Sequence, residues 1–243
     1  MSLEILISGA NGTIGRALVQ LIDEDDHYRV ADRATRQKFF EPDIDADVII
    51  DFSNPDFLDR ILAYAVRRHL PLVIGTTGLN QQQSESIRQA SQRIAICHAA
   101  NFSRGVTVLS HLADQAARML GSGFDVEIGE MHHRRKLDAP SGTALALGKV
   151  IAGARGAEHD DRAVFDRSQR RHAREHAEIG YQAVRGGDVV GEHTVFFLAD
   201  GERVELTHRA TDRRIFARGA LQAAARIIDR PPGLVEFADL LLD

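Results

Sequence analysis

The stretch LEILISGANGTIGRALVQLI at residues 3–22 decides the class of fold. It opens with a short, mostly apolar run rich in branched side chains, which is typical of a buried β-strand. Gly9, Gly12 and Gly15 follow the run, and the apolar residues after Gly15 recur at helical spacing. The stretch therefore predicts a strand, a glycine turn and a helix in direct succession.

The glycine turn has the properties of a dinucleotide site. Glycines at this spacing let the backbone bend sharply and approach a pyrophosphate, whose charge meets the N–H groups at the helix start. The alternative is a tight turn that packs without any ligand. We expect six consecutive residues to bind the cofactor, namely Gly9, Ala10, Asn11, Gly12, Thr13 and Ile14.

The pattern of a strand followed by a helix continues through the first hundred residues. Further strands are predicted at 29–31, 47–52, 71–75 and 94–96, with helices at 55–68 and 81–92. Strands that alternate with helices indicate an α/β fold, here a Rossmann-like doubly wound parallel sheet.

Ligands of such sheets bind at the carboxyl ends of the strands. Asp32 ends the second predicted strand, where an acid would bond the ribose hydroxyls, whereas the adjacent Arg33 would face a 2′-phosphate. We expect the loops after two later strands to form the nicotinamide side of the site, through Gly75, Thr76, Thr77, Ala99, Ala100, Asn101 and Phe102.

The pattern changes after Asn101. Helices are predicted at 105–120 and 141–151, strands at 124–131, 179–185, 189–198 and 203–209, and a last helix at 215–228. The pair Asp200-Gly201 signals a hairpin between the last two strands. Consecutive hairpins indicate a second, α+β domain with a mixed or antiparallel sheet. We place it at 104–213, between the two parts of the first domain at 1–103 and 214–243.

The sequence HHRRKLDAPSGT at residues 132–143 gathers five potential cations just before a predicted helix start. A helix start itself attracts anions, so the segment is suited to carboxylates or phosphates. The preceding strand would place His132 and His133 on opposite faces, so we expect one ring to donate a proton and the other to bind. The ammonium of Lys136 can lose a proton, whereas the arginines, which make up most of the basic residues, cannot. A solvated basic loop is the alternative.

The charges around His132 predict how it titrates. Neighbouring cations should lower its pKa in the empty site, and a bound dianion should favour the protonated form.

Composition excludes several classes of partner. The chain has 30 basic and 35 acidic side chains, so its formal charge of −5 gives no reason to expect nucleic acid or an anionic membrane as a partner. No apolar run approaches the roughly 18 residues of a spanning helix, and we expect a cytoplasmic protein. Cys97 is the only cysteine, which excludes internal disulfides. His172 and His176 lack the glutamate of a zinc protease motif, so we expect no metal.

The sequence resembles the 4-hydroxy-tetrahydrodipicolinate reductase family, also called dihydrodipicolinate reductases, of lysine and diaminopimelate biosynthesis. The segment at 132–143, extended to Ala144, is the most specific part of the resemblance. That segment lies within a longer match at Glu130–Leu145, and the other matching segments are Gly9–Gly15, Asp51–Ser53, Gly75–Gly78, Ala99–Ser103, Arg185–Asp188 through Gly191–Thr194, and Phe216–Ala220.

The resemblance implies an oxidoreductase that uses NADH or NADPH to reduce a small dicarboxylate. It implies a dinucleotide-binding first domain and a second domain for substrate binding and for assembly of a homotetramer. His132 would be the proton donor or acceptor and Lys136 a second donor, while His133, Gly142 and Thr143 would hold the substrate carboxylates. Thr13 stands where the family usually has an arginine near the cofactor phosphates, so we expect dual or NADH-leaning cofactor use.

Two other functions are compatible with the glycine turn. Extended short-chain dehydrogenases act through a Tyr-x-x-x-Lys motif, but the residues four places after Tyr28, Tyr64 and Tyr181 are not lysines. A nucleotide-sensing regulator without enzymatic activity would keep the glycine turn but would not need the cluster at 132–143.

Overall fold

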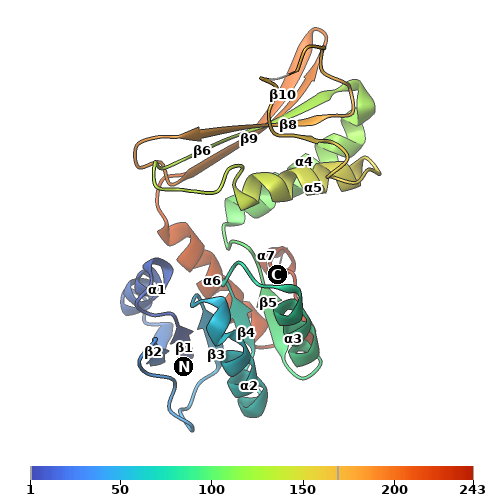
Figure 1. Cartoon of the computed structure of the whole chain (residues 1–243). Coiled ribbons are helices and arrows are strands. Elements are labelled where there is room, and N and C mark those ends of the chain that lie inside the picture. The colour runs from blue at the N-terminus through green and yellow to red at the C-terminus, as the bar shows by residue number, and fades with distance from the viewer. Residues whose placement is uncertain (1, 169, 243) are drawn as a thin grey trace. The chain divides into compact units, whose positions relative to one another are not determined.

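The computed structural model describes residues 2–168 and 170–242, and they form two compact units (Figure 1). One unit contains the chain up to Arg104 and again from Arg213. The other is Gly105–Asp212.

A six-stranded parallel sheet forms the centre of the first unit, with the strand order β11-β5-β4-β3-β1-β2. Its strands are β1 (Leu3–Ser8), β2 (Tyr28–Ala34), β3 (Val48–Asp51), β4 (Leu72–Ile74), β5 (Ala95–His98) and β11 (Gly233–Leu234). Its helices are α1 (Thr13–Asp23), α2 (Leu58–Arg68), α3 (Gln81–Ser91), α6 (Arg214–Ile227) and α7 (Asp239–Leu242), with a 3-10 turn at Pro55–Phe57. The predicted Rossmann-like sheet is confirmed.

Helices cover both faces of this sheet because its central strands are apolar on both sides. All four residues of β3 are buried. Side chains of α1, α6 and α7 pack with one set of strand residues, and side chains of α2 and α3 pack with the alternate set. The strand order reverses between β1 and β3, and open α/β sheets bind ligands at such a reversal.

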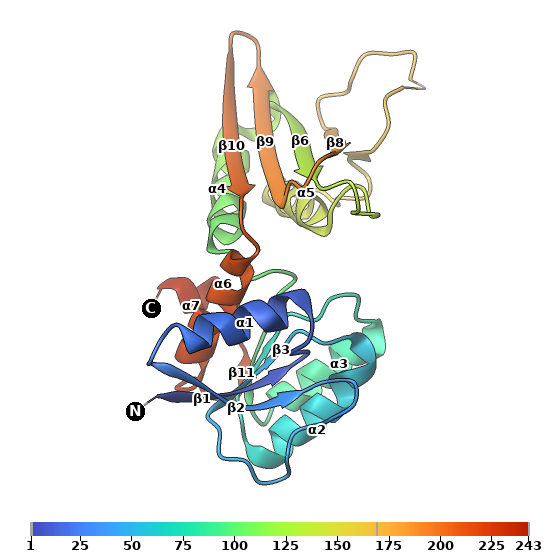
Figure 2. The same ribbon diagram turned by 90° about the vertical axis from the view of Figure 1, so that its left-hand side faces the viewer.

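The second unit holds a mixed five-stranded sheet with the order β10-β9-β6-β8-β7 (Figure 2). Its elements are α4 (Arg104–Leu120), a 3-10 turn at Gly121–Gly123, β6 (Asp125–His132), α5 (Gly142–Ala154), β7 (Ala163–Val164), β8 (Ile179–Arg185), β9 (Gly191–Ala199) and β10 (Glu202–Ala210). Both α4 and α5 pack against one face of this sheet, where Val126, Ile128, Val195 and Phe197 are fully buried.

Two expectations about strands were wrong. The consecutive strands β8 and β9 form no hairpin, because β6 lies between them and pairs parallel with β8 and antiparallel with β9. Only the hairpin of β9 and β10 through Asp200-Gly201 is as predicted. Strand β2 is also longer than predicted, since its pairing with β1 continues to Ala34, and it therefore includes Asp32 and Arg33.

The arginine-rich segment between α5 and β8 is attached to the sheet more firmly than a solvated loop would be. Arg167 pairs with Glu127 and Glu178, at 2.9 and 2.5 Å. Arg174 donates to the carbonyl groups of Val126 and Glu178. Neither His172 nor His176 lies in a helix, so they do not have the geometry of a metal-binding helix face.

In the ranges that the structure describes, no helix combines the length and apolarity needed to cross a bilayer.

Candidate active site

Two positions, one in the turn after β1 and one in the first turn of α1, require glycine. Gly9 has a φ of +79°, and a Cβ there would lie 2.3 Å from the carbonyl oxygen of Phe52. A Cβ on Gly15 would lie 2.2 Å from the carbonyl oxygen of Gly9. Helix α1 begins after Gly12 without a side-chain cap, so its first N–H groups have the arrangement that binds a phosphate.

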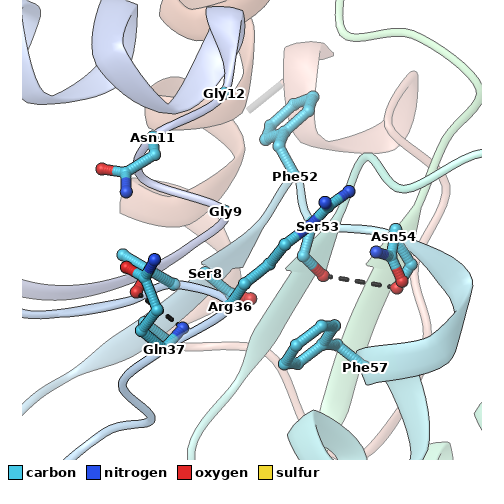
Figure 3. A pocket seen from close by; sticks show the side chains of 12 residues that line it. Ser8, Gly9, Asn11, Gly12, Arg36, Gln37, Phe52, Ser53, Asn54 and Phe57 are labelled. Atoms are coloured by element: carbon cyan, nitrogen blue, oxygen red, sulfur yellow. Dashed lines mark hydrogen bonds between the residues drawn. The ribbon is translucent and has the colours of Figure 1, made fainter.

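A pocket lies beside this turn, where the strand order reverses (Figure 3). The turn contributes Gly9, Asn11 and Gly12, and Arg36 extends across the pocket toward Ser53. Among the described residues the pocket is lined by Ser8, Gly9, Asn11, Gly12, Ala34, Thr35, Arg36, Gln37, Phe52, Ser53, Asn54 and Phe57. The pocket suits a nucleotide, because it combines the backbone amides of the glycine turn with one cation, Arg36, and the aromatic rings of Phe52 and Phe57.

Asp32 does not line this pocket, because its carboxylate is occupied by the loop that follows β2. It accepts hydrogen bonds from the backbone N–H groups of Arg33 and Glu41, at 2.7 and 3.0 Å, and from Lys38 Nζ at 3.3 Å. Burial raises the pKa of Asp32, but these bonds outweigh it and the pKa lies below its ordinary value. Arg33 does not line the pocket either, whereas Arg36 does.

Asp51 ties together the loops after two strands. It is fully buried, and each of its carboxylate oxygens accepts a hydroxyl at 2.6 Å, one from Ser53 and one from Thr76. Its backbone carbonyl also accepts the N–H of Gly75 at 2.8 Å. Burial raises the pKa of Asp51, and the hydroxyl bonds oppose that shift. The side chain of Thr76 is therefore used to fix the loop.

The remaining predicted cofactor residues lie farther along the same sheet edge. Gly75–Thr77 follow β4, and Ala99–Phe102 follow the adjacent β5. Phe102 is fully buried and its ring packs edge-on against Phe52 and Phe237. Thr77 and Ala100 are exposed, so they are the members of these loops most accessible to a ligand.

A second candidate centre lies in the other unit, at the polar end of its helix-covered sheet face. Alternate residues of β6 are buried there, and after Val126 and Ile128 the next two are Glu130 and His132. The Nδ1 atom of His132 lies 2.6 Å from Oε2 of Glu130. The Glu130 side chain is completely buried, so a carboxylate stands in a position that the strand pattern would give to an apolar residue.

Glu130 is ionised because four donors surround it. Arg185 donates to both carboxylate oxygens, at 2.8 and 2.6 Å. The backbone N–H of Ser141 donates to Oε1 at 3.1 Å, and the fourth partner is His132. Burial raises the pKa of Glu130, but the bonds from Arg185 and His132 outweigh burial and hold the pKa below its ordinary value.

The pKa of His132 is lowered, as the sequence predicted, but the order of causes differs. Burial lowers it most, Glu130 opposes that shift, and Lys136 and Arg185 lower it further. The basic cluster is therefore a smaller cause than desolvation.

His193 faces His132 from β9, with the two rings edge-on and their centres 5.1 Å apart. It is 4% exposed, and burial lowers its pKa to about 4, so the ring is neutral at physiological pH. Its Nε2 atom lies 2.9 Å from Oγ of Ser141, whose oxygen also accepts the N–H of Ala144 and caps α5.

The other predicted substrate residues follow His132 in the chain. His133 lies outside β6 and is half-buried, so strand alternation does not describe it. Lys136 Nζ forms an ion pair with Asp138 at 2.8 Å. Gly142 and Thr143 begin α5 immediately after the Ser141 cap, where N–H groups attract anions. Within the described ranges no three histidine, cysteine or acidic residues are placed to hold a metal ion.

Comparison with known proteins connects both centres to one family. Residues 3–102 match the family described as dihydrodipicolinate reductase, N-terminus, and residues 105–241 match its C-terminus. The chain belongs to the dihydrodipicolinate reductase family. It is 42% identical to the 4-hydroxy-tetrahydrodipicolinate reductase of Halorhodospira halophila, over 99% of each chain.

Solved structures support the fold of a dihydrodipicolinate reductase. The dipicolinate-bound dihydrodipicolinate reductase of Paenisporosarcina sp. TG-14 superposes with a TM-score of 0.77 at 22% identity, covering 97% of this chain and 98% of the other. An engineered D-amino acid dehydrogenase bound to NADP+ has a TM-score of 0.55 at 11% identity, with 98% and 94% covered. At these sequence identities, the two structures are evidence for the fold alone.

Several polar residues of the second centre were not singled out from the sequence. Glu130, Arg185 and His193 lie in segments that matched the family, but no role was assigned to them. Glu130 shares a strand face with His132, and this two-residue spacing was the signal that it faces the same centre. Ser141 was identified only as a marker of the helix start.

Proposed function

We propose that this chain is an NAD(P)H-dependent 4-hydroxy-tetrahydrodipicolinate reductase of diaminopimelate and lysine biosynthesis. The observation that carries the proposal is the centre at the end of β6, where the Glu130–His132 pair lies beside the start of α5 and the cation of Lys136. The identity of 42% with a reductase of that name, over nearly the whole chain, supports the same substrate.

The residues of the first unit fit a dinucleotide. The turn at Gly9 and Gly12 would take the pyrophosphate, the pocket beside Arg36 the adenosine end, and Thr77 and Ala100 the nicotinamide end. When bound, the reduced nicotinamide supplies a hydride. The protein must then hold the substrate and move a proton.

The residues of the second unit fit the remaining steps. The N–H groups of Gly142 and Thr143, with the side chain of His133, would hold the two substrate carboxylates. The hydride adds to the conjugated cyclic imine that remains once the hydroxy substrate has lost water. His132 protonates the enamine formed, and Lys136 is a second donor. The dianion raises the low pKa of His132 and so favours its proton-donating form.

Cofactor choice follows from the cations near the adenosine end. Thr13 provides no charge for a phosphate, but Arg36 lies in the pocket and provides one. We therefore expect the chain to use both NADH and NADPH, with Arg36 as the residue that contacts a 2′-phosphate. Asp32 and Arg33 were the sequence candidates for the ribose, and they are the weaker candidates because they lie outside the pocket lining.

Membership of the family supports our expectations for assembly. We expect the first unit to bind the dinucleotide, and the second to bind substrate and to form a homotetramer. A cytoplasmic location agrees with the single cysteine, which suits a reducing compartment.

Substitution of Lys136 by alanine tests the proposal. We expect turnover to fall by about 100-fold or more, because a charged proton donor is lost, while cofactor affinity is kept. Lys149→Ala is the matched control, since Lys149 is an exposed lysine of α5. A nucleotide sensor would instead show no substrate-dependent cofactor oxidation in any of the three proteins.

A further inference from the structure

We propose that Glu130 is a positioning residue that fixes His132 in one tautomer and holds the start of α5 in register with it. The part of this inference that concerns turnover rests on the proposed function. The part that concerns the imidazole does not, because it is measurable without substrate.

Four hydrogen bonds hold the Glu130 carboxylate in place. Oε2 lies between Nδ1 of His132 and one nitrogen of Arg185, and Oε1 accepts the other nitrogen of Arg185 and the N–H of Ser141. These partners belong to β6, β8 and the cap of α5, so one buried group joins three parts of the unit. A carboxylate with four short contacts has little freedom to turn.

The Glu130 carboxylate determines the tautomer of His132. An ionised carboxylate accepts hydrogen bonds and donates none, so the ring nitrogen that faces it must carry a hydrogen. Nδ1 is therefore protonated in both charge states, and Nε2 is the atom that gains or loses the proton. A Cβ on Gly191 would lie 3.0 Å from Nε2, so glycine at this position prevents crowding of that atom.

Ser141 connects the proposed proton donor, His132, to the proposed anion site at the start of α5. The N–H of Ser141 is held by Glu130, and its hydroxyl caps α5 and contacts His193. The next two residues, Gly142 and Thr143, are the proposed carboxylate binders. Glu130 thus sets the position of Nε2 relative to the helix start that would hold the substrate.

The charges around His132 determine what loss of the carboxylate does. Arg185 on β8, Lys136 in the loop after β6 and His193 on β9 surround the ring, with Glu130 as its hydrogen-bonded anion and Asp138 paired with Lys136. His208 on β10 lowers the pKa of His193. Without the carboxylate, Arg185 loses its hydrogen-bonded anion, and the imidazole lies beside the cations of Arg185 and of Lys136, of which only Lys136 keeps its ion pair with Asp138.

The test is Glu130→Gln, with Glu127→Gln as the matched control. Glu127 lies on the same strand and pairs with arginine, but it is on the opposite face from His132. Nitrogen-15 NMR of the histidine rings, without substrate, should show that E130Q lowers the pKa of His132 by about one unit or more and releases the Nδ1–H tautomer. E127Q should leave both unchanged.

Turnover supplies the second readout. We expect E130Q to lower kcat at least about tenfold, to move the alkaline limb of the pH profile to lower pH and to leave the KM for cofactor unchanged. Should E130Q fail to fold, Glu130→Asp keeps the charge on a side chain that is one methylene shorter. In E130D we expect the pKa of His132 to stay close to the wild-type value and kcat to fall, because the shorter side chain no longer positions the ring.

An unchanged pKa and tautomer of His132 in E130Q, or an unchanged kcat in E130D, would overturn the inference. If the NMR result holds and the wild-type chain reduces no dicarboxylate, the proposed function fails and the tautomer assignment stands.

Discussion

Acidification should destabilise the fold through His193, and the size of the effect follows from its burial. The ring is 4% exposed, and desolvation lowers its pKa from the ordinary 6.5 to about 4. His132, His208 and Lys136 contribute in the same direction, while Glu130 opposes them. The folded chain therefore holds this imidazole neutral at pH values where the unfolded chain protonates it.

Protonation of His193 in the unfolded chain sets the sign and size of the effect. The full stability is present above pH 6.5 and is lost as the pH falls toward 4, because the unfolded state binds the extra proton. At about 1.4 kcal/mol per pH unit, the whole gap corresponds to about 3 kcal/mol of unfolding free energy, and the change from pH 8 to pH 5 to about 2 kcal/mol.

Urea denaturation of the full chain at pH 8 and pH 5 measures this loss. His193→Gln retains an amide that can reach Ser141 but does not titrate, so its loss between the two pH values should be about 2 kcal/mol smaller than that of wild type. The control is His172→Gln, which changes an exposed ring and should behave as wild type. Equal pH dependence of wild type and H193Q would refute the reasoning.

Two further substitutions test the two candidate centres. Arg36→Ala should raise the KM for NADPH by about tenfold and that for NADH by less than about twofold, because only NADPH carries the 2′-phosphate that a guanidinium would bind. Steady-state kinetics with both cofactors decide this, and equal effects would contradict it. Gly191→Ala places a methyl 3.0 Å from Nε2 of His132, and we expect kcat to fall about tenfold with cofactor affinity unchanged. A normal kcat would contradict the claim that the open space beside Nε2 is needed for turnover.

The sequence predicted β1, β3, β4 and β5 because their signals are local. Each of these strands is a short, mostly apolar run that ends at glycine or a polar loop, and close contacts admit only glycine at Gly9, after β1, and at Gly15, in α1. The two-residue strand β11 was not predicted. The end of β2 was misplaced because its last residues, Asp32 to Ala34, are kept in the strand by pairing with β1. The end of a strand that is set by pairing with another strand cannot be predicted from the strand's own residues.

The second centre was found only in part for the same reason. The basic cluster contains His132, Lys136 and the start of α5 within a dozen residues, so it was visible in the sequence. The partners that fix His132 come from distant positions, since Arg185 is 55 residues from Glu130 and His193 reaches Ser141 across 52. The burial that dominates the pKa of His132 also depends on the packing of the whole unit.

Transfer of deuterium from the cofactor tests the central claim most directly. NADH or NADPH deuterated at C4 of the nicotinamide is mixed with the chain and freshly prepared 4-hydroxy-tetrahydrodipicolinate, and the product is examined by mass spectrometry. We predict substrate-dependent oxidation of either cofactor, with one deuterium in the tetrahydrodipicolinate formed. Cofactor that binds but is not oxidised, or a product without deuterium from either position at C4, would contradict the account.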